Sequence, residues 1–85
     1  MKEMRILGLM ITDRIKEAGR TQKVLTKNAA IIKSRLGFHE VSEDICSRVG
    51  MILLQLGGKS SEWEQLENEL KTIEGLEIQK MNFQY

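Results

Sequence analysis

Three basic side chains, Lys33, Arg35 and Arg48, form the one charged cluster that strand pairing predicts in this chain. Lys33 and Arg35 alternate along one apolar segment and Arg48 lies in the next, so antiparallel pairing places all three on one face of a hairpin. Guanidinium and ammonium groups hold carboxylates and phosphates through charge-assisted hydrogen bonds. We therefore expect these residues to bind a small anionic ligand. A row of solvated charges at a sheet edge is the alternative explanation.

His39 and Cys46 flank the turn of the same hairpin and are of residue types that bind transition metals. A closed zinc site takes four ligands and a catalytic one takes three, so Glu40, Glu43, Asp44 or a neighbouring subunit would have to complete it. A solvated turn and an ordinary strand cysteine explain the same residues. We expect no metal and no other cofactor, and a single cysteine cannot supply the thiolates of an iron–sulfur cluster.

The segment Gly57-Gly58-Lys59-Ser60-Ser61 places backbone donors at the start of a helix, where an anion is favoured. Helix capping explains this segment equally well. Ser61 is a suitable cap, and Glu64, three residues later, completes a capping box. We find no catalytic motif, and His39, a candidate general acid or base, lies in a turn.

Nucleic-acid binding is not expected from the composition. The formal net charge is +1, whereas a domain that grips duplex DNA carries a strongly basic surface. RNA recognition by small sheet domains depends on aromatic residues exposed on the central strands. No aromatic residue lies in Met4–Thr12 or Ile45–Leu56, the two segments that we expect to be those strands.

The segment Ile45–Gly58 is the element that the rest of the chain must cover. Its consecutive apolar residues predict a strand with both faces away from water, and the paired glycines end it. Met4–Thr12 is a second strand of this kind. Ile31–Phe38 is a third, in which Ile32, Leu36 and Phe38 share one face, and we expect them to lie with Val49, Met51 and Leu53.

Two helices complete the pattern. Ile15–Asn28 is a weak helix with Ala18, Thr21, Val24 and Leu25 on one side, and Gly19 is expected to allow its start to slip towards Thr21. The second helix begins at Ser61 and carries a single apolar stripe. Gly75 then ends it, and Leu76–Phe83 is the last strand. The stripe consists of Trp63, Leu66, Leu70 and Ile73.

This order of elements predicts an α+β fold, a ferredoxin-like (ACT-like) βαββαβ sandwich with four antiparallel strands and two helices on one face. The central strand is longer than the sheet, so the hairpin is expected to project as an arm. Helices on one side leave the other apolar face of the inner strands uncovered. We therefore expect a homo-oligomer, a dimer or a tetramer, assembled through the sheet and the hairpin arm.

The 85 residues are expected to form a single domain. No apolar run approaches the roughly 20 residues that cross a bilayer, and no segment resembles a secretion signal. We therefore expect a cytoplasmic protein without membrane or direct DNA contacts.

Three segments together resemble one family, the iron-only hydrogenase system regulators. They are Ile-Leu-Gly-Leu-Met-Ile-Thr-Asp-Arg, ending at Arg14, Ile-Ile-Lys-Ser-Arg-Leu-Gly, ending at Gly37, and Leu-Leu-Gln-Leu-Gly-Gly, ending at Gly58. The resemblance implies an ACT-like domain related in fold to the sensory half of the nickel-responsive repressor. The chain lacks a ribbon-helix-helix segment, and the histidines of a nickel site are reduced to His39, so neither DNA nor nickel binding carries over.

These observations favour a free-standing regulatory domain that oligomerises and binds a small ligand or a protein partner, with no chemistry of its own. The resemblance implies that it regulates an iron-only hydrogenase system. The alternative is a small oligomeric enzyme of ferredoxin-like fold, with its site between the sheet and a partner subunit. A cavity containing titratable groups would favour that alternative.

Overall fold

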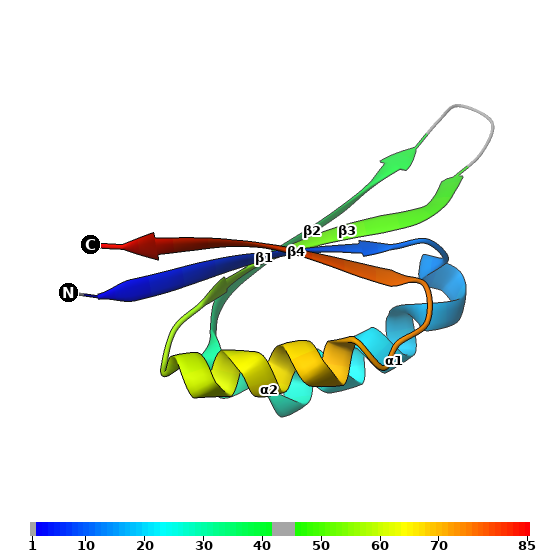
Figure 1. The fold of residues 1–85 in the computed structure, drawn as a ribbon. Helices are drawn as coiled ribbons and strands as arrows, with labels where there is room; N and C mark the ends of the chain where they lie inside the picture. Colours follow the sequence, from blue (N-terminus) through cyan, green and yellow to red (C-terminus); the bar gives the residue numbers. More distant parts are fainter. Residues whose placement is uncertain (1, 42–45) are drawn as a thin grey trace.

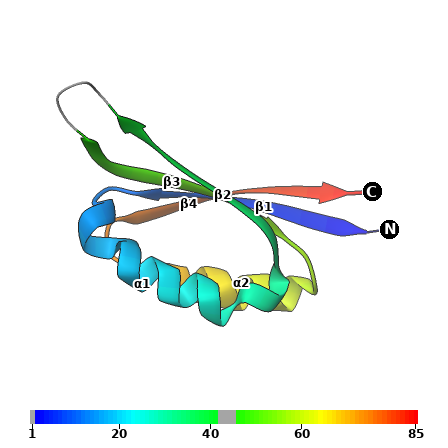
Figure 2. The same ribbon diagram turned by 180° about the vertical axis from the view of Figure 1, so that it is seen from behind.

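The computed structural model describes residues 2–41 and 46–85, and the side chains of residues 2–37 and 49–85. Its strands form one antiparallel sheet in the order β2-β3-β1-β4, and both helices cover the same face of that sheet (Figures 1 and 2). This arrangement is the predicted ferredoxin-like βαββαβ sandwich. The elements are β1 (Glu3–Ile11), α1 (Arg14–Lys27), a short 3-10 turn (Ala29–Ile31), β2 (Ile32–Val41), β3 (Cys46–Leu56), α2 (Ser60–Leu70) and β4 (Leu76–Gln84).

The core lies between the two inner strands and the helices. Alternate residues of β1 and β3 point towards the helices, and the apolar stripe predicted for α2 packs against them. Each fully buried leucine contributes about 1.5 to 3 kcal/mol to the free energy of unfolding. The sheet and the two helices are therefore held together mainly by this layer. Its buried members include Leu7, Leu9, Leu25, Leu54, Leu56, Trp63, Leu66, Leu70 and Ile73.

Helix α1 starts at Arg14, earlier than the sequence predicted. The Asp13 carboxylate accepts a hydrogen bond from the Lys16 backbone N–H at 3.2 Å, and this cap fixes the start despite Gly19. The buried side of the helix consists of Glu17, Thr21 and Leu25. Ala18 is exposed, although it lines the same groove as Thr21 on this side of the helix.

Helix α2 starts at Ser60, so the predicted cap by Ser61 and the capping box with Glu64 were wrong. The Glu62 carboxylate instead accepts a hydrogen bond from the Lys59 backbone N–H at 3.0 Å. The regular helix ends at Leu70, and Gly75 adopts a φ of 78° just before β4. Its carbonyl oxygen accepts a hydrogen bond from the Thr12 N–H at 2.9 Å, which ties the start of β4 to the end of β1.

The hairpin pairing agrees with the predicted register over its middle part, where Leu36 pairs with Leu53 and Phe38 pairs with Met51. A register shift between Ile32 and Ser34 changes the start of β2. Ile32 pairs with Leu56 on the helix side, so its predicted place beside Leu36 was wrong. The extra residue in β2 is Lys33, which forms a β-bulge.

The hairpin extends past the strands beside it. The last pair between β1 and β3 joins Ile11 to Gly50, whereas β3 begins four residues earlier, at Cys46. Figure 1 shows the described ends of β2 and β3 continuing beyond β1 and turning away from the helices. The tip of the predicted arm lies outside the described residues. Neither described helix is long and apolar enough to cross a membrane.

Candidate functional site

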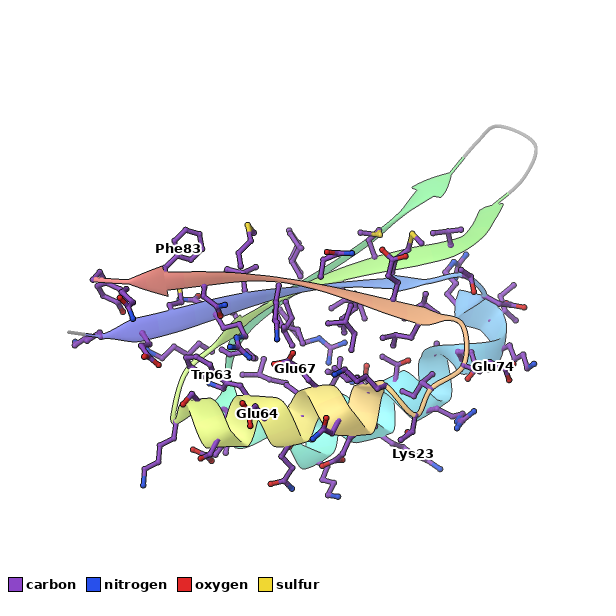
Figure 3. All side chains as sticks on the ribbon, viewed as in Figure 1. Lys23, Trp63, Glu64, Glu67, Glu74 and Phe83 are labelled. Carbon is purple, nitrogen blue, oxygen red and sulfur yellow. The ribbon has the colours of Figure 1, made fainter. Side chains whose placement is uncertain are left out.

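The sheet face opposite the helices carries a row of apolar side chains on all four strands, which we call the open face. Pairing places Ile6 beside Met81, Met4 beside Phe83, and Leu36 beside Leu53 on this face. Figure 3 shows Phe83 on the side of the sheet opposite Trp63 and Glu67. The described apolar members of the open face are Met4, Ile6, Met10, Leu36, Val49, Met51, Leu53, Met81 and Phe83.

Every apolar residue of the open face is at least partly exposed, whereas their β1 neighbours Leu7, Leu9 and Ile11 are buried. Leu36 retains 61% of its surface and Phe83 retains 49%. Monomeric proteins rarely expose contiguous apolar patches of more than a few hundred Å². The sequence predicted that one set of alternate apolar residues on the inner strands would not be covered by the helices, and the described chain has such a set. The open face is therefore a candidate contact surface.

Lys33 and Arg35 line one groove, which we call the basic groove, at the start of β2. The groove has a volume of about 290 Å³, and Leu25, Thr26 and Ala29 form its other wall. The Lys33 side chain is exposed and runs across Gly57, where an added Cβ would lie 2.5 Å from Lys33 Cε. Gly57 therefore leaves the space that the lysine stem occupies.

Arg35 lies on the helix side of the sheet because it pairs with Leu54. One of its guanidinium nitrogens, Nη2, donates a hydrogen bond to Gln22 Oε1 of α1 at 2.9 Å. This contact holds the guanidinium over the edge of the sheet while leaving the residue exposed. Arg35 thus places a cationic group beside the groove, which suits a small carboxylate or phosphate, whereas the Lys33 stem runs across Gly57, which does not line the groove.

The backbone of Arg48 lies further along the hairpin than those of Lys33 and Arg35. It lies six residues before Leu54, the partner of Arg35, and a regular strand advances about 3.3 Å per residue, which separates the two backbones by about 20 Å. The cluster of all three side chains therefore stays a prediction. The side chains of Arg48, His39 and Cys46 lie outside the described residues. The metal site considered for His39 and Cys46 therefore lies outside them too. Among the described side chains, no three histidine, cysteine or acidic groups gather around a common point.

At the start of α2, a carboxylate of the chain itself accepts the hydrogen bond that an external anion could accept. Glu62 Oε1 accepts a hydrogen bond from the Lys59 backbone N–H, and an added Cβ on Gly58 would lie 3.1 Å from the same oxygen. Gly58 has a φ of 78°, which glycine adopts without a steric cost. Capping therefore explains the Gly57-Gly58 segment, and the carboxylate of Glu62 takes the place of an external anion.

A buried ionic network lies between α2 and the strands β1 and β4. The Glu67 side chain is 6% exposed and forms ion pairs with Arg5 of β1 and, at 3.3 Å, with Lys80 of β4. The guanidinium of Arg5 also donates to Asn82 Oδ1 and lies 5.2 Å from the centre of the Trp63 ring. Trp63 Nε1 donates to the Gly57 carbonyl oxygen at 2.6 Å. The network thus fixes α2 to the sheet at one end.

The network was not expected from the sequence, although the sequence contains one signal for it. Glu67 lies four residues after Trp63 and three before Leu70, which places it on the apolar side of the helix. A charged residue at such a position is rarely left without a partner. The identity of that partner required the tertiary fold, because Arg5 is 62 positions away in the chain.

A second groove, missed by the sequence analysis, lies between α1 and the strands β2 and β3. It has a volume of about 200 Å³ and includes Ala18, Gly37, Gly50 and Ile52 in its lining. The space beside Gly37 is empty, because an added Cβ there would meet nothing closer than the Met51 carbonyl oxygen at 3.9 Å. Among its described lining residues, Arg14 is the one that carries a charge, and none is acidic.

No protein-family model and no curated protein matches the chain. Solved structures do share its fold. The match to an uncharacterized protein from Thermotoga maritima has a TM-score of 0.81 and 23% identity, and it covers 99% of this chain and 100% of that one. At this level of identity the match demonstrates the fold alone.

Two more distant structures extend the comparison. CPII, a nitrogen regulatory PII-like protein from Thiomonas intermedia solved with ADP, AMP and bicarbonate, has a TM-score of 0.61 and 9% identity, covering 98% of this chain and 92% of that one. A dimeric ferredoxin-like protein of unknown function from Thermobifida fusca has a TM-score of 0.50 and 9% identity, covering 99% and 92%. All three place the chain among small ferredoxin-like domains.

Proposed function

We propose that this chain is a free-standing regulatory domain that assembles into a homo-oligomer and responds to a small ligand or a protein partner, without chemistry of its own. The observation that supports the proposal best is the open face, where apolar side chains of all four strands remain exposed. A stable specific interface buries roughly 800 Å² per partner, and one face of a four-stranded sheet is of this order. The dimeric state named for the Thermobifida fusca protein is compatible with this proposal.

The ligand that we propose is a small anion, a carboxylate or a phosphate, held in the basic groove by Lys33 and Arg35. Arg35 and the Thr26 hydroxyl provide donors for its oxygens, and Lys33, which lines the same groove, adds a second cation on a long stem. The PII-like protein is a regulatory relative in fold that was solved with nucleotides and bicarbonate, which are anions. We carry over the class of ligand only as a proposal.

We also propose that the regulated target is an iron-only hydrogenase system and that the protein acts in the cytoplasm. The support is the resemblance of the segments that end at Arg14, Gly37 and Gly58. A host strain that lacks this chain is expected to show altered hydrogenase activity, and the wild-type gene is expected to restore it. Unchanged activity under hydrogenase-inducing conditions would contradict this target and leave the other parts of the proposal standing.

The oligomer is tested by substitution on the open face. Light scattering at micromolar concentration should give a wild-type mass above that of one chain, and Leu53→Glu should lower it. Ile15→Glu is the matched control, because Ile15 is 66% exposed but lies on α1, in the opposite layer. A monomeric wild-type protein, or equal masses for the two variants, would refute assembly through the open face.

The ligand site is tested by thermal unfolding in the presence of phosphate, acetate and citrate. At least one anion is expected to raise the melting temperature of the wild-type protein and to lose most of this effect in Arg35→Ala. Arg20→Ala is the control, because Arg20 is an exposed arginine of α1 that does not line the basic groove. The same shift in Arg35→Ala as in Arg20→Ala would remove Arg35 from the proposed site.

A further inference from the structure

The hydrogen bonds at the ends of β1 and β4 determine which backbone groups of β4 point away from the sheet. Lys2 and Tyr85 exchange both of their backbone hydrogen bonds, at 2.6 and 2.9 Å, and Thr12 donates to Gly75 at the other end. In an antiparallel pair, hydrogen-bonded and non-hydrogen-bonded positions alternate. The regular register from Glu3 to Ile11 therefore assigns the odd-numbered residues of β4 to hydrogen bonding with β1.

The even-numbered residues of β4 consequently direct both their N–H and their C=O groups to the outside of the sheet. β4 is the last strand in the sheet order, so no strand of the described sheet lies beside these groups. Their side chains point to the helix side, as their pairing with Leu7, Leu9 and Ile11 requires. The five residues are Leu76, Ile78, Lys80, Asn82 and Gln84.

The two edges of the sheet differ in how they are protected. Natural edge strands avoid pairing with other chains through bulges, prolines and charged side chains. The β2 edge has a bulge at Lys33, a second register shift near His39, and the charge of Arg35. The β4 edge pairs with β1 over nine residues without a shift, and the chain contains no proline. Its lysine, Lys80, turns under the sheet and forms an ion pair with Glu67 at 3.3 Å.

We propose that β4 pairs antiparallel with β4 of a second copy of this chain, which joins two sheets into one of eight strands. A two-fold axis perpendicular to the sheet generates this pairing and keeps all four helices on the same side. Even-numbered residues then face even-numbered residues, so each outward N–H meets an outward C=O. A second copy fits because its β4 offers the same regular alternation.

Charge limits the register of this pairing. Lys80 directly opposite Lys80 of the second copy would place like charges in one cross-strand pair, which is unfavourable. Registers that place Lys80 opposite Ile78 or Asn82 of the second copy avoid this contact. In the register that places Lys80 opposite Asn82, Met81 faces Met81 of the second copy, so the two open faces join. In the register that places Lys80 opposite Ile78, Met81 faces Glu77 of the second copy.

The edge interface is separate from the interface through the open face, so the two can be disrupted independently. Both together would produce a tetramer with two kinds of two-fold contact. Asn82→Pro removes an outward N–H without removing a hydrogen bond to β1, since Arg5 and Asn82 form a non-hydrogen-bonded pair. Asn82→Ala is the matched control, because both variants lose the side-chain bond from Arg5 Nε but only the proline loses the N–H.

Sedimentation of these variants at micromolar concentration tests the proposal. We expect a wild-type tetramer, the same mass for Asn82→Ala, half that mass for Asn82→Pro, half for Leu53→Glu, and a monomer for the double variant Asn82→Pro/Leu53→Glu. A monomeric Leu53→Glu protein, or equal masses for Asn82→Pro and Asn82→Ala, would overturn the edge interface. Equal masses for Leu53→Glu and Ile15→Glu would instead contradict only the open-face contact.

Amide hydrogen exchange of the wild-type protein provides a measurement that does not depend on the folding of a variant. If β4 is paired on both sides, the amides of Ile78, Lys80 and Asn82 exchange as slowly as those of Glu77, Gln79 and Met81. Fast exchange confined to the three even-numbered residues would mean that the outer edge of β4 meets water, and it would overturn the proposal.

Discussion

Glu67 is a charged residue in a buried position, whereas carboxylates favour exposure to water. A carboxylate that is 6% exposed has lost most of its hydration, and the chain compensates it with Arg5 from β1 and Lys80 from β4. The desolvation cost of such a group is several kcal/mol, and its partners must offset that cost. The pairing therefore specifies how α2 lies on the sheet more than it adds to the free energy of unfolding.

Replacing Glu67 is expected to destabilise the protein through the charge that it leaves behind. In Glu67→Ala, Arg5 remains largely buried without its carboxylate partner, and we expect a loss of about 3 to 5 kcal/mol in the free energy of unfolding. Urea unfolding followed by the fluorescence of Trp63, the chain's single tryptophan, measures this loss.

Two further variants identify the cause of that loss. Glu67→Gln keeps the shape of the side chain and an acceptor for Arg5, so its loss should be smaller than that of Glu67→Ala. Lys80→Ala removes a cation that is 50% exposed, and exposed ion pairs contribute about 1 kcal/mol or less. A loss for Glu67→Ala no larger than that for Lys80→Ala would contradict this account.

At the scale of elements, local patterns in the sequence predicted the type of each helix and strand but not its boundaries. The apolar stripe from Trp63 to Ile73 was sufficient to identify α2 and its buried side. The start of α2 depended on which side chain caps the first backbone N–H groups of the helix. The sequence contains two candidates, Ser61 and Glu62. The bulge at Lys33 reversed the side of Ile32, because one extra residue in a strand moves the residues before it to the opposite face.

The candidate site was predicted less well than the fold, for a physical reason. Lys33 and Arg35 are two residues apart, so their proximity follows from the chain itself, and the structure places both beside the basic groove. The position of Arg48 depended on the length of the hairpin pairing, which no local pattern determines. The contact of Arg5 with Glu67 and the groove beside Gly37 depend on how α1 and α2 pack on the sheet.

Two glycines that look alike in the sequence are expected to respond oppositely to substitution. Gly75 has a φ of 78°, and an added Cβ would lie 2.8 Å from Thr12 Oγ1, so Gly75→Ala should destabilise the protein by about 1 to 2 kcal/mol from backbone strain alone. Gly19 lies within α1, and an added Cβ would meet nothing within 4 Å. Gly19→Ala should therefore stabilise it by about 0.5 to 1 kcal/mol.

Thermal unfolding of the two glycine variants distinguishes these effects. The melting temperature should fall for Gly75→Ala and rise for Gly19→Ala. A rise for Gly75→Ala would show that the turn before β4 does not need a positive φ. A fall for Gly19→Ala would show that α1 is not helical at this position.

At the scale of the whole molecule, the helices cover one face of the sheet while the other face and the β4 edge stay open. The open face is mainly apolar, and the formal net charge of the chain is +1. Contacts with other protein surfaces fit this arrangement better than contacts with a polyanion.

We therefore predict that the protein does not bind duplex DNA by itself. Neutralising several phosphates requires a basic surface and makes the affinity fall steeply with salt. Fluorescence anisotropy with a labelled duplex, titrated at low and at moderate salt, is expected to show no sub-micromolar binding. Tight binding that weakens steeply with added salt would contradict the prediction.

Lys2 and Tyr85 lie side by side, paired with each other at one end of β1 and β4 (Figure 1). This position determines how the domain responds to a mechanical load. A force that pulls Lys2 and Tyr85 apart acts across the two strands, so it opens their hydrogen bonds one pair at a time from that end. The strands peel apart instead of sliding past each other, and the resistance at any moment is that of a single pair. A domain tethered through these two residues would therefore unfold at a low pulling force, by sequential separation of β1 from β4.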